Sequence, residues 1–219
     1  MKGLLTICVM AGLIFTTTGL VRADDVILPP WAGANNTVYA AWSDWADFSG
    51  PMLPESWASA PEGLASPAAY AYQNASLLES YEGRFGVIQL AGDSELLFDM
   101  PNFVGGSYKE VWIQVTYFPT LGQSPRFDVV GAGIQDVTTP IFIDSVEWGD
   151  GWVTGAWNFQ IWPNPEGEEI WLNFAGASGA PLYSAYVDQV VIDTMCVPEP
   201  ATMALLGLGS MALLRKRRA

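Results

Sequence analysis

The sequence predicts an all-β protein, a two-sheet sandwich of jelly-roll-like order preceded by an irregular N-terminal segment. Two observations lead to this fold class. The middle of the chain consists of short runs rich in β-branched and aromatic residues, and glycine, proline, asparagine and aspartate separate these runs at even spacing. About eight strands so spaced are typical of a sandwich. The expected strands are 85–90, 95–100, 110–118, 126–130, 140–148, 151–162, 169–175 and 183–192.

The region that precedes these strands is less regular. We expect one early strand near 38–42, and then a long proline-containing loop that extends to residue 67. A short helix is expected at 68–79. Farther along, Gly149-Asp150-Gly151 separates two of the expected strands and is typical of a tight hairpin turn.

The N-terminus has the pattern of a secretory signal peptide. Lys2 is followed by a largely apolar stretch, and Val21-Arg22-Ala23 then places acceptable residues before a cleavage site. We therefore expect residues 1–23 to be removed after Ala23, with an uncleaved N-terminal anchor as the alternative.

The C-terminus, residues 197–219, carries three features in a fixed order. Pro198-Glu199-Pro200 is followed by an apolar run at 201–214 and by a basic cluster of Arg215, Lys216, Arg217 and Arg218. As a helix this run would be roughly 21 Å long, which is short for a hydrocarbon core of about 30 Å. The basic cluster is expected on the cytoplasmic side of the membrane. An ordinary tail anchor is the alternative.

This three-part tail resembles the PEP-CTERM sorting signal. The resemblance implies export through the secretion machinery, transient anchoring in the inner membrane, and recognition by an exosortase there. It further implies removal of the tail and a final place in the outer envelope, on the cell surface or in the extracellular matrix. It covers the tail alone, so it implies nothing about the function of the rest of the chain.

Residues 24–196 form the body of the chain, and their length fits a single domain. The body has 22 acidic and three basic side chains, a formal charge of −19. This charge excludes nucleic acid as a partner, because its phosphates require lysine and arginine. It is compatible with solubility outside the cell and with divalent cations.

The chain contains no histidine. A Ser-His-Asp triad, a Cys-His pair and a His-ligated metal site are therefore excluded. Cys8 would leave with the signal peptide, so Cys196 is the only thiol of the body and an internal disulfide is excluded. Lys109 is the only lysine of the body.

All ten tryptophans lie in the body, and alternation along three expected strands places several of them beside amides or hydroxyls on the less apolar face. If these strands are neighbours in one sheet, they form an aromatic platform suited to polysaccharide. The alternative is that the N-terminal segment covers these rings and forms a second small core with them. The candidate ligand-binding residues are Trp112, Gln114, Trp152, Asn158, Gln160, Trp162, Trp171 and Asn173.

Carboxylates allow two further hypotheses. Paired acids can hydrolyse a glycosidic bond, and the sequence offers two groups, Asp144 with Glu147 and Asp150, and Glu166 with Glu168 and Glu169. Calcium is the one cofactor for which the sequence offers ligands, and no EF-hand spacing accompanies them. The calcium candidates are Asp44, Asp47, Asp150 and Asp188.

We therefore expect an exported cell-surface or matrix protein with a non-catalytic body that binds polysaccharide. A carbohydrate-active enzyme with paired carboxylates, or a purely structural matrix protein, is the alternative. No catalytic residue is assigned.

Overall fold

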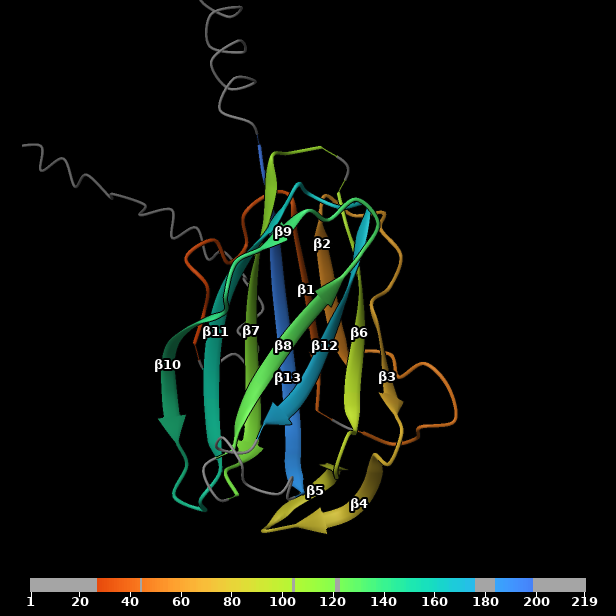
Figure 1. Cartoon of the computed structure of the whole chain (residues 1–219), viewed down its shortest axis with the longest axis vertical. Helices are drawn as coiled ribbons and strands as arrows, with labels where there is room; N and C mark the ends of the chain where they lie inside the picture. Colours follow the sequence, from red (N-terminus) through yellow and green to blue (C-terminus); the bar gives the residue numbers. More distant parts are fainter. Residues whose placement is uncertain (1–26, 44, 104, 121–122, 176–183, 199–219) are drawn as a thin grey trace, which may run out of the picture.

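The computed structural model describes residues 27–43, 45–103, 105–120, 123–175 and 184–198. Within these ranges the protein is all β, with two antiparallel sheets packed face to face (Figure 1). The predicted two-sheet sandwich is confirmed.

The larger sheet has the strand order β10-β11-β7-β13-β1-β2. Two strands share one edge of β13, because β5 pairs with its start and β1 with its later part. Short β4 pairs with β5, and β9 pairs with the end of β11. The bounds are β1 (Thr37–Trp42), β2 (Ser56–Ala60), β4 (Ser76–Tyr81), β5 (Arg84–Leu90), β7 (Tyr108–Phe118), β9 (Asp136–Val137), β10 (Ile141–Glu147), β11 (Val153–Trp162) and β13 (Ala185–Val197).

The smaller sheet has the order β3-β6-β12-β8. Its strands are β3 (Ala68–Tyr72), β6 (Glu95–Pro101), β8 (Ser124–Val130) and β12 (Gly167–Ala175). From β5 onward the chain crosses from one sheet to the other at almost every connection, and β13 lies between β5 and β7 while β12 lies between β6 and β8. This interleaving is the order of a jelly roll.

The core lies between the sheets, where the alternating apolar residues meet. Side chains alternate between the two faces of a strand, so each strand contributes every second residue to the core. The apolar side chains at odd-numbered positions of β7 and β11 point inward and meet those at even-numbered positions of β12. Each buried aliphatic or aromatic side chain contributes roughly 1.5–3 kcal/mol. Fully buried members include Val111, Ile113, Val115, Phe159, Ile161, Ile170 and Leu172.

Two expectations for the N-terminal half are wrong. The helix expected at 68–79 is replaced by β3 and β4, because the edge of β6 pairs with β3 and Ala69 exchanges two backbone hydrogen bonds with Met52. Gln73, with a φ of 60°, turns the chain between these strands. The long loop expected before residue 67 contains β2, which pairs with β1.

The later strands follow the expectation closely. Gly149-Asp150-Gly151 forms the predicted turn between β10 and β11, and there Trp148 N–H donates to the Trp152 carbonyl at 2.8 Å. Gly151 has a φ of 89°, a backbone conformation that favours glycine. The last strand is longer than predicted and ends at Val197, because β7 continues to pair with it.

Candidate functional site

The three strands of the predicted aromatic platform do not lie in one sheet. β7 and β11 are neighbours, and Trp112 lies opposite Asn158 in their register. β12, which carries Trp171 and Asn173, belongs to the other sheet. A single platform that includes all three strands is therefore not formed.

The N-terminal segment covers the centre of the larger sheet's outer face. Trp112 donates its indole N–H to the Ile27 carbonyl at 3.0 Å, and the Gln114 side chain accepts from the Ile27 N–H at 2.9 Å. Trp31 packs edge-on against Trp112, with ring centroids 6.1 Å apart. Trp112 is only 5% exposed, so it belongs to the covered second core that the sequence offered as the alternative.

Trp152 is fully buried at the end of the sandwich where β4 and β5 meet. Its indole donates to the Glu82 carbonyl at 3.1 Å, and its ring packs against Phe118. The Arg84 guanidinium lies 5.0 Å from its centroid. Trp152 therefore supports Arg84 and is not open to a ligand.

A smaller group of aromatic and polar residues remains partly open on the outer face of the larger sheet. Trp162 stacks on Tyr108 with centroids 4.3 Å apart and planes at 20°. Gln160 donates to Glu110 at 3.1 Å, and Asn158 donates to the Val111 carbonyl at 3.1 Å. The group consists of Tyr108, Glu110, Asn158, Gln160 and Trp162.

Trp171 and Asn173 lie on the outer face of the smaller sheet. Trp171 packs against Tyr72 of β3 with centroids 5.1 Å apart. Asn173 donates to the Glu95 carboxylate at 3.2 Å. Asn173 also lines a cleft at the edge of the smaller sheet.

A cleft of about 360 Å³ opens where edge strand β8 of the smaller sheet faces β11 and the segment before β10 in the larger sheet. We call it the edge cleft. Apolar rings and a few polar groups converge on it, as in small-molecule and glycan sites. Its lining residues are Pro125, Arg126, Phe127, Asp128, Thr139, Pro140, Trp157 and Asn173.

The aromatic part of the edge cleft continues onto the surface. Trp157 packs against Phe127 at 5.4 Å and against Phe142 at 5.6 Å between centroids. Phe142 is 54% exposed, and Ile141 and Ile143 beside it on edge strand β10 are exposed as well. An exposed apolar patch of this kind is typical of an interaction site.

Local sequence explains how the edge cleft is built. Alternation on β8 turns Phe127 inward and leaves Arg126 and Asp128 on the rim. Gly155, two residues before Trp157 on β11, makes room for the ring, because a Cβ there would lie 2.4 Å from a Trp157 ring carbon. Sequence reasoning missed the cleft because its walls come from separate sheets.

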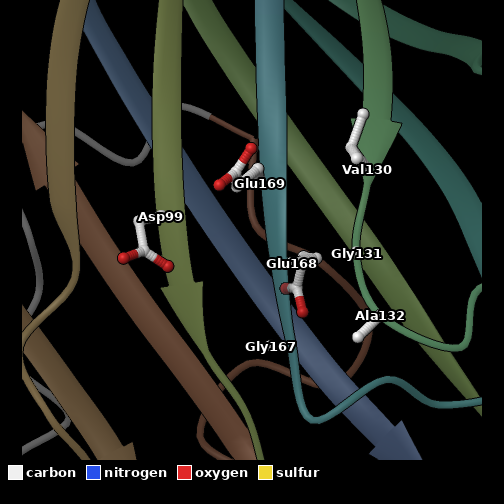
Figure 2. A pocket seen from close by; sticks show the side chains of 7 residues that line it. All are labelled: Asp99, Val130, Gly131, Ala132, Gly167, Glu168 and Glu169. Atoms are coloured by element: carbon white, nitrogen blue, oxygen red, sulfur yellow. The ribbon is translucent and has the colours of Figure 1, made fainter.

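A second hollow, also of about 360 Å³, lies on the smaller sheet and is lined by carboxylates (Figure 2). Asp99 of β6 and Glu169 of β12 are register partners, and both are exposed. Figure 2 shows them on neighbouring strands, with the Glu169 carboxylate directed toward the Asp99 strand. Glu168 comes from the same strand as Glu169 but points to the opposite face.

Glu168 is buried between the sheets and pairs with Lys109, which has no exposed surface. Burial raises the pKa of Glu168, and the Lys109 ammonium acts in the opposite direction. Its second oxygen, Oε2, has no hydrogen-bond partner. The pair links β7 to β12, and the sequence did not predict it, since Glu168 was named only as a candidate acid for hydrolysis.

Cys196 lies beside Lys109 in the register of β13 and β7. Its thiol is buried and donates to Asn102 Oδ1 at 2.7 Å. Burial raises the pKa of this thiol, which keeps it in the neutral form. Cys196 is therefore a packed part of the core at the end of β13.

The calcium candidates that the structure describes do not form a set of metal ligands. Asp44 lies outside the described residues; Asp47 is exposed, and hydrogen bonds from Ser49 lower its pKa. Asp150 and Asp188 both contact Arg84, which lies 3.5 Å from Asp150 Oδ2 and donates to Asp188. Within the described ranges, no three His, Cys, Asp or Glu side chains gather as they would around a metal ion.

The acids proposed for hydrolysis are separated as well. Asp144 and Glu147 are exposed on β10, whereas Asp150 contacts Arg84. In the second group Glu168 faces the core and Glu169 faces solvent. Asp99 and Glu169 are exposed acids that lie opposite each other in the register of β6 and β12. The sequence named Glu169 as a candidate acid but did not single out Asp99.

Of the sorting motif, only Pro198 lies within the described residues; Glu199, Pro200 and the basic cluster lie outside them. The described part of the chain has no helix long and apolar enough to cross a membrane. Comparison with family models matches residues 197–218 to the PEP-CTERM protein-sorting motif, which confirms the resemblance of the tail. No curated protein and no solved structure matches the chain. The chain thus carries the sorting signal of an exported, exosortase-sorted protein.

Proposed function

We propose that the processed protein resides on the cell surface or in the extracellular matrix and binds polysaccharide there without catalysis. The tail supports the destination, because exosortase sorting implies export. The edge cleft supports the ligand class, because polar side chains line it and its aromatic cluster reaches the surface beside it at Phe142. The C–H faces of sugars stack on such rings, and amide and guanidinium groups hydrogen-bond to sugar hydroxyls.

Charge narrows the class of polysaccharide. The body has a formal charge of −19, and Arg126 is the one basic residue that lines the edge cleft. An acidic polymer would be repelled by the rest of the surface. We therefore propose a neutral glycan, bound by contact with the exposed ring of Phe142, which the buried Trp157 supports from behind, and by hydrogen bonds to Asn173 and Arg126.

The test titrates the processed protein with soluble neutral oligosaccharides of glucose, mannose and galactose. The readouts are tryptophan fluorescence and calorimetry. Phe142→Ala and Asn173→Ala are expected to weaken binding about tenfold or more at an unchanged melting temperature. Phe85→Ala is the matched control, because Phe85 is 76% exposed on β5, whereas Phe142 packs against the cleft residue Trp157. The proposal fails if no neutral glycan binds, or if the cleft variants bind as the wild type does.

A second candidate function is glycoside hydrolysis by Asp99 and Glu169. Register partners on antiparallel strands have Cβ atoms about 4.5–5.5 Å apart, which is compatible with the carboxylate spacing of retaining glycosidases, roughly 5–5.5 Å. Release of reducing ends from a neutral glycan, lost in Glu169→Gln and kept in Glu166→Gln, would favour this candidate. No release from any glycan that binds would eliminate it.

A further inference from the structure

The sorting motif begins directly at the end of a central strand. Val197 is the last residue of β13 and pairs with Tyr108 of β7. Its carbonyl accepts a hydrogen bond of 2.8 Å from the Ser107 N–H, and a Cβ on Gly106 would lie 2.8 Å from the same oxygen. The chain is thus fixed in the sheet up to the residue before Pro198.

This attachment limits how far the body can lie from the apolar run that starts at Ala201. The four residue-to-residue steps from Val197 to Ala201 span at most about 14 Å when fully extended. A membrane that holds residues 201–214 therefore holds the same end of the sandwich close to its surface. Figure 1 shows that β13 reaches this end at the top of the view, while the β4–β5 hairpin lies at the bottom.

We call the end of the sandwich at which β13 stops at Val197 the exit end. It presents the stacked rings of Tyr108 and Trp162 beside Val197. Trp162 is 37% exposed. Tryptophan and tyrosine are favoured at the membrane–water interface, where the ring meets apolar chains and the polar atom meets water. Trp148 has a similar exposure of 38% but lies in the β10–β11 turn and is held by Arg84 and Thr154.

We propose that in the unprocessed precursor this end of the sandwich faces the membrane, with the Tyr108–Trp162 pair in the lipid headgroup layer. The occupant of the surface is lipid, and the pair orients the body while the tail is attached. The proposal rests on the tail anchoring that the sorting signal implies. Glu110 and Glu166 lie at the same end, so zwitterionic lipid is favoured over anionic lipid.

The test uses the chain without its signal peptide but with its tail, bound to phosphatidylcholine vesicles. A fluorescent probe is attached at Glu166→Cys, close to the exit end, or at Glu79→Cys on β4 at the far end. Both variants carry Cys196→Ser, so that each has one thiol. Flotation with the vesicles reports anchoring by the tail, and quenching by headgroup nitroxide lipids reports the orientation of the body.

We expect both labelled proteins to float, and the Glu166→Cys probe to be quenched at least threefold more than the Glu79→Cys probe. The short link to the tail already keeps this end near the bilayer, so adding Tyr108→Ala and Trp162→Ala should at least halve this difference without abolishing it, whereas Trp148→Ala should leave it unchanged. Equal quenching at both sites, or a difference that loss of both rings leaves unchanged, would overturn the proposal. A protein that does not float would instead refute membrane anchoring by the tail.

The same precursor distinguishes lipid from a protein partner. If the Glu166→Cys probe is quenched in protein-free vesicles, lipid alone suffices to orient the body. If quenching requires added bacterial membrane protein, the surface docks on a protein, and the lipid proposal is wrong. Loss of glycan binding through the edge cleft would change neither result, so the two proposals fail independently.

Discussion

Lys109 on β7 and Glu168 on β12 form a buried ion pair that joins the two sheets of the sandwich. Lys109 is the only lysine of the body, and neither side chain has exposed surface. Charged groups are costly to bury, so each partner depends on the other for its place between the sheets.

Removal of either partner should destabilise the protein strongly. Lys109→Met or Glu168→Leu is expected to lower the free energy of unfolding by about 3–5 kcal/mol, because one charged group then stays buried without its partner. Urea unfolding of the processed protein measures this loss. The double variant Lys109→Met with Glu168→Leu should lose much less than the sum of the single variants. Additive losses would show that the two residues are not coupled.

The raised pKa of Glu168 predicts a pH dependence. Below its ordinary value of 4.5 the carboxyl is protonated in both the folded and the unfolded protein. As the pH rises from 4.5, the unfolded chain loses this proton first, so the wild type loses stability relative to Glu168→Gln. Unfolding measured at pH 4 and at pH 7 tests this trend. A wild type that gains stability relative to the variant over this range would contradict it.

Trp112 should be structural and not part of a ligand site. The segment that contains Ile27 and Trp31 covers its ring, so Trp112→Ala is expected to cost about 3–5 kcal/mol, as in a core. Thermal melting measures the loss. Trp162→Ala, at a more exposed ring, should cost clearly less. If Trp112→Ala melts like the wild type and loses glycan binding, the ring is open after all.

Gly155 should be required for the shape of the edge cleft. Gly155→Ala places a methyl group against the Trp157 ring, which must move, at a cost of about 1–3 kcal/mol. We expect weaker glycan binding and a changed tryptophan spectrum. Gly149→Ala is the control, because nothing lies within 4 Å of a Cβ there. Equal effects of both substitutions would exclude a specific role of the Trp157 contact.

Period-two alternation already places Lys109 and Glu168 on the inward faces of their strands, although the sequence-based hypotheses assigned neither residue to the core. Lys109 is in phase with Val111 and Ile113, and Glu168 is in phase with Ile170 and Leu172. A lysine and a glutamate on inward positions of two strands predict a pair only if those strands face each other. That facing depends on the interleaved strand order, which no local pattern contains.

The failure of the aromatic platform has the same cause. The face on which each tryptophan lies followed from period-two alternation, but β12 joined the other sheet. In the same way, the sequence predicted a helix at 68–79, but residues 68–72 pair with β6 and form β3. The local preference of a segment is overridden when a neighbouring strand offers partners for its backbone groups.

The sequence by itself determined the all-β class, the sandwich, most strand positions and the sorting tail, because these depend on local periodicity, turn residues and a contiguous motif. Only the tertiary structure decided which rings are covered, that Lys109 meets Glu168, and that the edge cleft forms between β8 and β11. These features join residues that are distant along the chain, and their contact free energy exists only once both sheets have packed.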